Sequence, residues 1–239
     1  MAPREEPSTS LATYGGVMHI FIAGGHGKIA LLLSRLLANA GHTTTGFIRN
    51  PDHAADLKAA GADPVVLDLE TSTRDEVAAA VAGADAVVFA AGAGPGSGPE
   101  RKLTVDRDGA ILLAEASVAA GVARFIVVSS IGADDFDAES DDEMQVYLRA
   151  KGEADAAVRS LDLDWTIVRP GGLTNDAPTG LVIVAERSDR SSISRADVAA
   201  VLAAALETDA TIGRQFEVVG GTTPIADALA SLSGPAQTE

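Results

Sequence analysis

A glycine-rich turn, Gly24-Gly25-His26-Gly27, is the feature of this sequence that most restricts its fold. A short apolar run at residues 18–23 precedes the turn, and residues 29–37 repeat apolar side chains at helical spacing after it. Glycines let the backbone turn tightly and approach a phosphate, and a helix N-terminus offers unpaired N–H groups and a positive dipole end. The order of strand, glycine turn and helix therefore predicts the first βαβ unit of a dinucleotide-binding sheet.

Strand-like and helix-like segments alternate along the rest of the chain. Further strands are expected at residues 43–49, 64–68, 86–90, 124–129, 165–169, 181–185 and 215–219. Further helices are expected at residues 51–60, 73–81, 105–120, 144–160 and 195–206. The helix at residues 73–81 is expected to start from a capping box formed by Thr73 and Glu76. Val- and Ile-rich strands joined by helices are typical of an α/β fold, a doubly wound parallel sheet that binds ligands beyond the carboxyl ends of its strands.

The chain ends and one acidic stretch are expected to lie outside this core. Residues 1–17 contain Pro, Ser and Thr without a period and predict a disordered N-terminal segment. Residues 18–239 are expected to form one domain, in which about residues 170–239 make a small substrate or lid region. The acidic residues between 134 and 143 are interpreted as a solvated loop.

Composition and charge exclude several classes of function. Acidic residues outnumber basic residues by 34 to 18, so the net charge is −16 at pH 7. A field of that sign repels nucleic acids and anionic membranes, and neither is expected as a partner. Without Cys the chain can form no disulfide or thiolate nucleophile, and its four His show no metal-ligand spacing, so no metal is expected. No membrane-length apolar run or secretory signal is visible, which predicts a cytoplasmic protein.

The ends of the second and third expected strands bear on the choice of cofactor. Sites that prefer NAD usually carry an acid after the second strand, whereas this chain has Arg49. A guanidinium can grip a 2′-phosphate with two hydrogen bonds, so NADP (NADPH) is favoured over NAD. The alternative is that Arg49 is a solvated charge at a strand end. Asp68 either lies at the adenine edge or caps the loop before the next helix.

An ordered set of motifs resembles a known protein family. The set comprises residues 24–30, Arg49-Asn50-Pro51, Asp68-Leu69, residues 89–92, residues 128–132, Tyr147 with Lys151, and residues 166–173. In this order the motifs resemble the atypical short-chain dehydrogenase/reductases, in particular the single-domain NAD(P)H-binding group near the NmrA-like proteins and the biliverdin/flavin reductases. The resemblance covers about residues 18–222 and implies a Rossmann-like NAD(P)-binding fold in a single domain.

The resemblance also implies which residues surround the cofactor. The turn at residues 90–92 would line the ribose and nicotinamide side, Ser129 would lie beneath the nicotinamide, and residues 170–173 would cover it. The full set of implied cofactor-binding residues is Gly24, Gly25, His26, Gly27, Lys28, Ile29, Arg49, Asp68, Leu69, Ala90, Ala91, Gly92, Ser129, Lys151, Pro170, Gly171, Gly172 and Leu173.

Tyr147 and Lys151 match the Tyr-x-x-x-Lys pair of the family, which implies a catalytic role for both. Positions i and i+4 share one face of a helix, and an ammonium near a phenol favours the phenolate. Tyr147 would then donate a proton to a carbonyl oxygen as hydride reaches the carbon, while Ser130 would hold the substrate oxygen. Asp106 departs from the Asn of many relatives, which puts a proton relay through that position in doubt.

These features favour an NADP(H)-binding oxidoreductase that transfers hydride to a small carbonyl, quinone or flavin-like acceptor. One alternative is a non-catalytic NADP(H)-binding redox sensor that regulates a partner. A second is a nucleotide-sugar epimerase or dehydratase, which the short chain after Arg169 disfavours. The expected partner is a small-molecule substrate, and the protein is expected to be a monomer or a homodimer.

Overall fold

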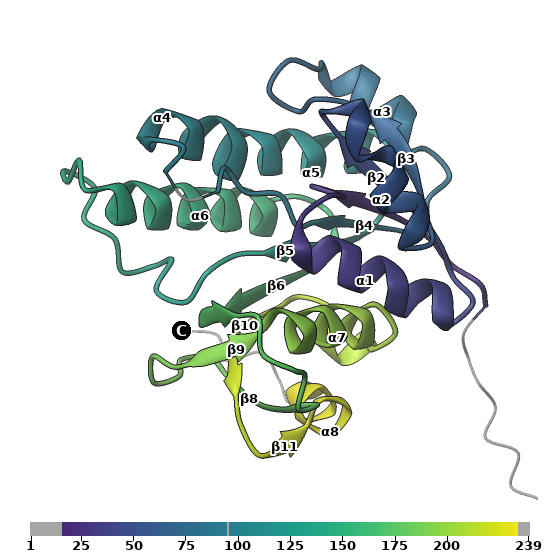
Figure 1. Cartoon of the computed structure of the whole chain (residues 1–239). Coiled ribbons are helices and arrows are strands. Elements are labelled where there is room, and N and C mark those ends of the chain that lie inside the picture. The colour runs from purple at the N-terminus through teal and green to yellow at the C-terminus, as the bar shows by residue number, and fades with distance from the viewer. Residues whose placement is uncertain (1–15, 95, 234–239) are drawn as a thin grey trace, which may run out of the picture.

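The apolar runs of the sequence form the strands of two sheets in the computed structural model, which describes residues 16–94 and 96–233. The strands are β1 (His19–Ala23), β2 (Thr43–Ile48), β3 (Ala62–Val66), β4 (Ala86–Phe89), β5 (Arg124–Val128), β6 (Asp164–Pro170), β7 (Gly172–Thr174), β8 (Leu181–Ala185), β9 (Ser192–Ser194), β10 (Arg214–Gly220) and β11 (Thr223–Pro224). The main sheet has nine strands in the order β11-β8-β10-β6-β5-β4-β1-β2-β3, and β7 pairs with β9 separately (Figure 1).

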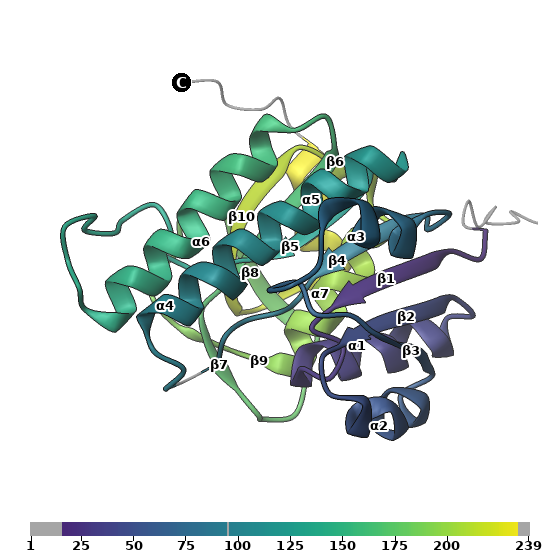
Figure 2. The same cartoon turned by 90° about the horizontal axis from the view of Figure 1, so that it is seen from above.

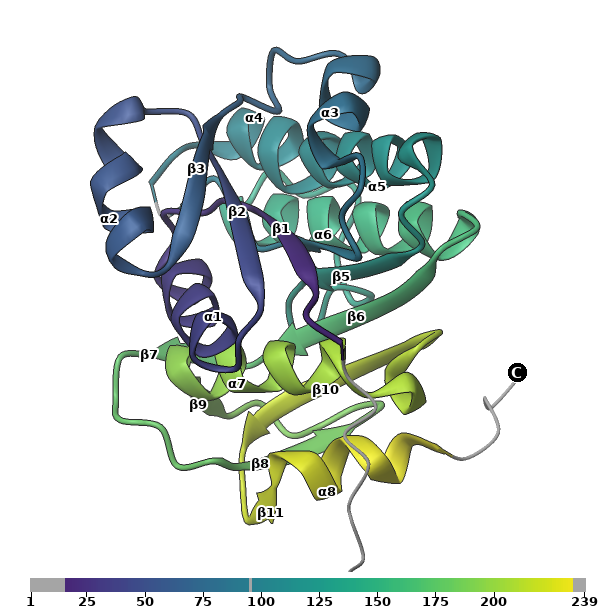
Figure 3. The same ribbon diagram turned by 90° about the vertical axis from the view of Figure 1, so that its right-hand side faces the viewer.

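Every strand pairing from β3 to β10 across the main sheet is parallel, and only β8 and β11 add antiparallel pairs. The chain builds outward from β1 in one direction to β3, then crosses back to β4 and continues the other way. Figure 3 shows the resulting twist of the sheet from β3 to β10. The order of strands therefore reverses between β1 and β4, where a sheet of this kind binds its ligand.

Helices connect the strands and cover both faces of the sheet. They are α1 (Lys28–Asn39), η1 (Pro51–His53), α2 (Ala54–Ala59), α3 (Arg74–Val81), α4 (Pro99–Arg101), the π-helix η2 (Lys102–Asp108), α5 (Gly109–Ala120), α6 (Glu143–Ser160), α7 (Arg195–Leu206), η3 (Asp209–Thr211), α8 (Ile225–Ala230) and η4 (Ser231–Ser233). Within the described residues, no helix is both long and apolar enough to cross a membrane.

The core lies in two apolar layers because successive strand residues point to opposite faces. On β1, Ile20 and Ile22 pack with α1 and α7, whereas Phe21 and Ala23 pack with α3, α5 and α6. Figure 1 shows α5 and α6 on one side of the sheet and α1 and α7 on the other, and Figure 2 shows α5 beside α6. The predicted doubly wound α/β fold in a single domain is confirmed.

The helix that the sequence predicts at residues 105–120 is longer and less regular than expected. Helical structure begins at Pro99, and residues 102–108 adopt the wider π-helix before α5 starts. Pi-helical turns are often found at functional sites. Here the wide turn directs two charged side chains, Lys102 and Asp106, into buried positions against α6.

The sequence predicts a disordered segment at residues 1–17 and a substrate or lid region at about residues 170–239. Residues 1–15 of the predicted disordered segment lie outside the described residues. In the region predicted to form a substrate or lid part, β8 and β10 join the main sheet and α7 packs against α1. Part of that region therefore belongs to the core, and a lid role for its loops stays a prediction.

Candidate functional site

A cavity of about 480 Å³ lies at the carboxyl ends of β1, β2, β3 and β4. Its lining residues are Gly24, His26, Gly27, Phe47, Ile48, Arg49, Asn50, His53, Leu67, Asp68, Leu69, Glu70, Ala90, Ala91, Gly92 and Val105. A volume of this size is in the range of small-molecule and cofactor sites. The cavity coincides with the reversal of strand order between β1 and β4, so both topology and shape indicate a ligand site.

The glycines of the turn let its backbone lie close to the chain after β4 and to the N-terminus of α1. Gly24 has φ +77°, and a Cβ there would lie 2.6 Å from the Ala91 Cα. Gly27 caps α1 without a capping side chain, and the first turn of this helix contains no acid. The positive end of the α1 dipole is therefore available to an anion, as a dinucleotide site requires.

A cluster of charges lies at the end of β2, where the sequence predicts contact with a 2′-phosphate. Arg49 Nη1 donates to Glu70 Oε2 at 2.9 Å, and 53% of the Arg49 side chain is exposed. The same oxygen accepts from Arg101 Nη2 at 3.0 Å, and Thr104 donates to the other Glu70 oxygen at 2.7 Å. Arg49 is thus ion-paired rather than simply solvated, and a ligand phosphate would compete with Glu70 for it.

Asp68 has the geometry of a loop cap and also lines the cavity. Its Oδ1 accepts a hydrogen bond from the Glu70 backbone N–H at 3.0 Å. The loop-cap alternative therefore describes this carboxylate, and contact with an adenine edge stays a prediction.

Tyr147 and Lys151 meet a second lysine on the face of α6 that packs against η2. Lys151 Nζ lies 5.9 Å from the centroid of the Tyr147 ring, and Lys102 Nζ lies 5.6 Å from it. Lys102 is also paired with Glu143, with 3.1 Å between Nζ and Oε1. The half-buried phenol therefore lies beside two ammonium groups, of which the sequence predicted only Lys151.

Lys151, on α6, is buried together with Asp106, from the π-helix η2. Lys151 Nζ is 3.1 Å from Asp106 Oδ1 and donates to the Val128 carbonyl at 3.0 Å. Burial acts to lower the pKa of Lys151, but the charges of Asp106 and Tyr147 outweigh it and raise that pKa above its ordinary value. The lysine therefore remains an ammonium inside the protein.

Asp106 connects this buried pair to the cavity. Its Oδ2 accepts from the Ala93 backbone N–H at 3.0 Å, and a Cβ on Gly92 would lie 3.1 Å from its Oδ1. Gly92 itself lines the cavity. The pair formed by Asp106 and Lys151 consequently lies directly behind the Gly92 end of the cavity.

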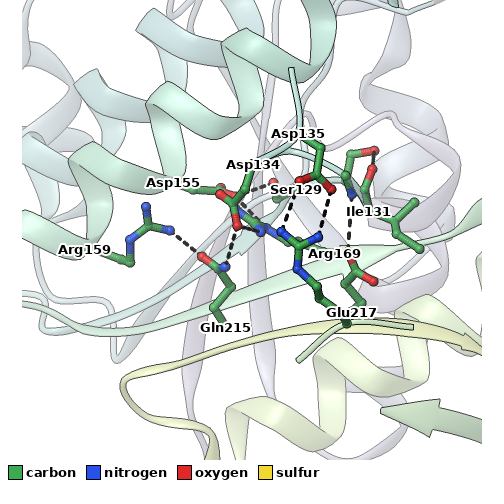
Figure 4. Close-up of polar contacts among 12 residues, drawn as sticks. Ser129, Ile131, Asp134, Asp135, Asp155, Arg159, Arg169, Gln215 and Glu217 are labelled. Carbon is green, nitrogen blue, oxygen red and sulfur yellow. Dashed lines mark hydrogen bonds and ion pairs between the residues drawn. The ribbon is translucent and has the colours of Figure 1, made fainter. Parts of the chain in front are cut away.

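Arg169, near the carboxyl end of β6, holds two carboxylates together. Its guanidinium donates to Asp134 Oδ1 at 2.7 Å and to Asp155 Oδ2 at 2.8 Å (Figure 4). Ser129 also donates to Asp155, at 2.7 Å. The side chain of Ser129, expected beneath the nicotinamide, is thus engaged in fixing α6 to the sheet.

The two carboxylates respond oppositely to their surroundings. Hydrogen bonding from Arg169 lowers the pKa of Asp134, whereas burial raises the pKa of Asp155 against the opposing charge of Arg169. Asp134 belongs to the exposed loop that the sequence predicts, but it also binds a buried cation far along the chain, which the sequence does not indicate.

The structure brings many, but not all, of the predicted site residues together. Those that line the cavity are Gly24, His26, Gly27, Arg49, Asp68, Leu69, Ala90, Ala91 and Gly92. Those outside its lining are Gly25, Lys28, Ile29, Ser129, Ser130, Tyr147, Lys151, Pro170, Gly171, Gly172 and Leu173.

The predicted residues outside the lining fall into distinct groups. Gly25 packs against β2, since a Cβ there would lie 2.9 Å from the Gly46 Cα. Gly171 and Gly172 bond to Val218 and Ser191, which ties the end of β6 to β10 and β9. Ser130 is half-buried, and its hydroxyl donates to the Ile131 carbonyl at 3.3 Å.

Sequence reasoning missed several residues of the site. His53 and Glu70 line the cavity. Arg101 donates to Glu70 and Lys102 lies beside the Tyr147 ring, both from the helical segment after β4 and both outside the lining. His53 follows Arg49 by four residues, so the sequence itself indicates that His53 lies near the end of β2. Nothing in the local sequence indicates the partners of Glu70.

Comparison with known proteins agrees with the fold and with NAD(P)H binding. The family model described as NAD(P)H-binding matches residues 24–209. A Bacillus subtilis protein named "Uncharacterized sugar epimerase YhfK" is 40% identical over 216 residues, covering 90% of this chain and 100% of its own. A structure named as a putative NAD-dependent epimerase/dehydratase from Bacillus halodurans has 40% identity and a TM-score of 0.83, covering 90% of this chain and 99% of its own. The oxidoreductase ylbE from Lactococcus lactis has 29% identity and a TM-score of 0.81, covering 93% of this chain and 100% of its own.

Proposed function

Because the chain belongs to the NAD(P)H-binding family of atypical short-chain dehydrogenase/reductases, we propose that it is an NADP(H)-dependent oxidoreductase. In this proposal hydride passes to a small carbonyl, quinone or flavin-like acceptor. The expected partner is therefore a small-molecule substrate.

One observation carries the proposal beyond cofactor binding. Asp106 joins the turn at Gly92 and Ala93 to the ammonium of Lys151, and Lys151 lies beside the Tyr147 ring. A proton donor, a buried cation and the end of the cavity are thus connected through direct contacts. Cofactor binding alone would give no role to the Tyr147 phenol beside this pair, which favours the enzyme over the sensor.

Different residues of the cavity would bind different parts of the cofactor. The glycine turn and the N-terminus of α1 would hold the pyrophosphate, Arg49 would bind the 2′-phosphate, and Ala90 to Gly92 would lie along the nicotinamide ribose. When bound, the cofactor supplies the hydride. Lys151 has three N–H groups, of which Asp106 and Val128 take two among the described residues, so one is left for the ribose.

Tyr147 would supply the proton that a carbonyl acceptor needs. Its hydroxyl would donate to the acceptor oxygen as the neighbouring carbon gains hydride, leaving an alcohol and a phenolate. The ammonium groups of Lys102 and Lys151 would stabilise that phenolate. Asp106 has a positioning role in this scheme, because it holds Lys151 in place without touching the acceptor.

The names of two relatives at 40% identity favour a second candidate, an epimerase or dehydratase acting on a sugar. In an epimerase of this kind the hydride is withdrawn and returned, so the cofactor is not consumed. The packing of β8, β10 and α7 into the main fold argues against it, since in the described residues these elements build the core rather than a separate sugar domain.

One experiment separates the candidates. The purified protein is incubated with NADPH and a panel of aldehydes, ketones, quinones and flavins, and loss of NADPH absorbance is recorded. In parallel, nucleotide sugars are incubated with the protein and catalytic NADP and analysed for new isomers. Stoichiometric NADPH loss with an acceptor supports the oxidoreductase, whereas isomer formation without net NADPH loss would support the epimerase and contradict our proposal.

A further inference from the structure

Two histidines form part of the wall of the cavity beside Arg49. The ring of His26, in the glycine turn, stacks on the ring of His53, at the end of η1. The ring centroids are 3.6 Å apart, and the planes differ by 13°. Both residues line the cavity, and the proposed function so far gives the stack no role.

Contacts around the stack hold it in one arrangement. His26 Nε2 lies 2.8 Å from Asp56 Oδ2 on α2. The Asn50 side chain accepts from the Asp52 N–H at 3.0 Å and caps η1, which fixes the short segment between Arg49 and His53. The two rings and the guanidinium are therefore positioned on the same side of the cavity before any ligand arrives. Within the described residues no cluster of His, Asp and Glu could hold a metal ion, so the stack is not a metal site.

The positive charges near the stack are partly neutralised by carboxylates, so they do not balance the two negative charges of a phosphate. The charged residues on the surrounding elements are Lys28 and Arg35 on α1, Arg49 after β2, Asp52 on η1, Asp56 and Lys58 on α2, Asp68 and Glu70 after β3, and Arg101, which reaches Glu70 from α4. Arg49 is already paired with Glu70. A dianionic phosphate at Arg49 would thus face two cavity-lining carboxylates, Asp68 and Glu70, and two arginines, Arg49 and Arg101, that already share Glu70.

An imidazole can make up this deficit by taking a proton. Histidine in short peptides titrates at about 6.5, so the energetic cost of protonating it near neutral pH is small. The centroids of the two rings lie only 3.6 Å apart, so two positive charges on the stack would repel each other and a bound phosphate would recruit a single proton. Asp56 Oδ2, 2.8 Å from His26 Nε2, would face that charge on His26.

We propose that the His26–His53 stack is a proton-linked recognition element for the 2′-phosphate of NADP(H), an inference that rests on the proposed function. On binding, one proton moves from solvent to an imidazole nitrogen of the stack, and no covalent bond of the cofactor changes. Because the protonated stack binds the phosphate better, NADPH affinity rises as pH falls from 8 towards 6. Below about pH 6 the phosphate itself takes up a proton, and the gain ends.

Isothermal titration calorimetry of the full chain tests this inference without any need for turnover. NADPH and NADH are titrated at pH 6.5 and pH 8 in buffers of different ionisation enthalpy, which gives the number of protons taken up. NADPH should bind with uptake of up to one proton and on the order of tenfold more tightly at the lower pH. NADH, which lacks the 2′-phosphate, should show neither effect.

Substitution of the two histidines tests whether the stack is the group that takes up the proton. Gln keeps a polar side chain that cannot be charged, so the double variant His26→Gln, His53→Gln should abolish proton uptake and the pH dependence of NADPH affinity. His26→Gln alone should remove most of both, because His26 is the ring that is paired with Asp56. The matched control is His42→Gln, because His42 is also paired with a carboxylate, Glu207 at 3.0 Å, but does not line the cavity. Its pH dependence should equal that of the unmodified protein.

Three results would overturn the inference in distinguishable ways. NADPH binding that is independent of pH and without proton uptake would remove the proton link and leave cofactor binding intact. Equal proton uptake with NADH and NADPH would show that the 2′-phosphate is not the group recognised. Failure of both cofactors to bind at either pH would overturn the proposed function itself, and this inference with it.

Discussion

Asp106 Oδ1 lies 3.1 Å from Lys151 Nζ, and both side chains are almost fully removed from solvent. Asp106 comes from the π-helix η2 and Lys151 from the middle of α6, so the ion pair ties together two elements behind the cavity. A buried charge that loses its partner is strongly destabilising, whereas an apolar pair of similar volume is often tolerated.

The ion pair therefore gives a prediction about stability. Asp106→Ala should lower the free energy of unfolding by about 3–5 kcal/mol, because it leaves the Lys151 ammonium buried without a counter-charge. The double variant Asp106→Leu, Lys151→Met should recover most of this loss. Urea unfolding followed by circular dichroism measures both. A loss below about 1 kcal/mol in the single variant would show that the pair does not hold η2 to α6.

The free energy of unfolding at acidic pH should depend more on Asp134 than on Asp135. Arg169 keeps the pKa of Asp134 below its ordinary value of 3.8, so the carboxylate stabilises the folded state above that value. This contribution is lost as the pH falls through the lowered pKa. Asp134→Asn should accordingly be less stable than the unmodified protein at pH 7, and the difference should shrink below about pH 4.

Asp135→Asn is the matched control for this prediction, since Asp135 pairs with Arg187, whose side chain is 70% exposed. Exposed pairs of this kind contribute little to stability. Urea unfolding from pH 3 to pH 7 compares the variants. The same pH profile for both substitutions would mean that the burial of Arg169 has no bearing on acid stability.

The glycine turn should tolerate no side chain at Gly24. Gly24→Ala places a methyl group 2.6 Å from the Ala91 Cα on a residue with positive φ, so the turn must shift and NADPH affinity should fall at least tenfold. Gly41→Ala is the control, because Gly41 has φ +89° but nothing within 4 Å of the added carbon. It should lose about 1–2 kcal/mol of stability from backbone strain and bind NADPH normally. Equal NADPH affinity in both variants would contradict the role of this turn.

Cofactor preference should respond to both members of the Arg49–Glu70 pair, in opposite directions. Arg49→Ala should remove about 1.5–3 kcal/mol of NADPH binding free energy and leave NADH binding nearly unchanged. Glu70→Gln should strengthen NADPH binding, because Arg49 no longer shares its charge with a carboxylate. Arg74→Ala removes an arginine that pairs with Asp75, outside the cavity, and serves as the control. Calorimetric titrations in which NADPH and NADH bind equally to the unmodified protein would refute this account of cofactor choice.

Local patterns in the sequence predict the fold well, for reasons visible in particular residues. The glycine turn and the capping box between Thr73 and Glu76 depend on a few neighbouring residues, and both are present. The continuous apolar run along β1 likewise predicts its two buried faces. These features need no information from elsewhere in the chain.

The charged interior could not be predicted in the same way. Asp134, Asp155 and Arg169 belong to a loop, a helix and a strand, and only the packing of α6 on β5 and β6 brings them together. The π-helix also escapes detection, because the apolar spacing of residues 105–120 fits an ordinary helix. The pairing of Asp106 with Lys151 depends on that irregular turn, so the sequence alone does not indicate that Lys151 is the partner of Asp106.

The most direct test of the central claim is the rate of NADPH-dependent acceptor reduction by Tyr147→Phe. This change keeps the ring between Lys102 and Lys151 but deletes the proton that the phenol would donate. With a carbonyl acceptor identified from the panel, kcat should fall by roughly 10²–10⁴ while the calorimetric Kd for NADPH stays the same. An unchanged kcat in Tyr147→Phe with that acceptor would contradict the account, because the acceptor would then gain its proton without Tyr147.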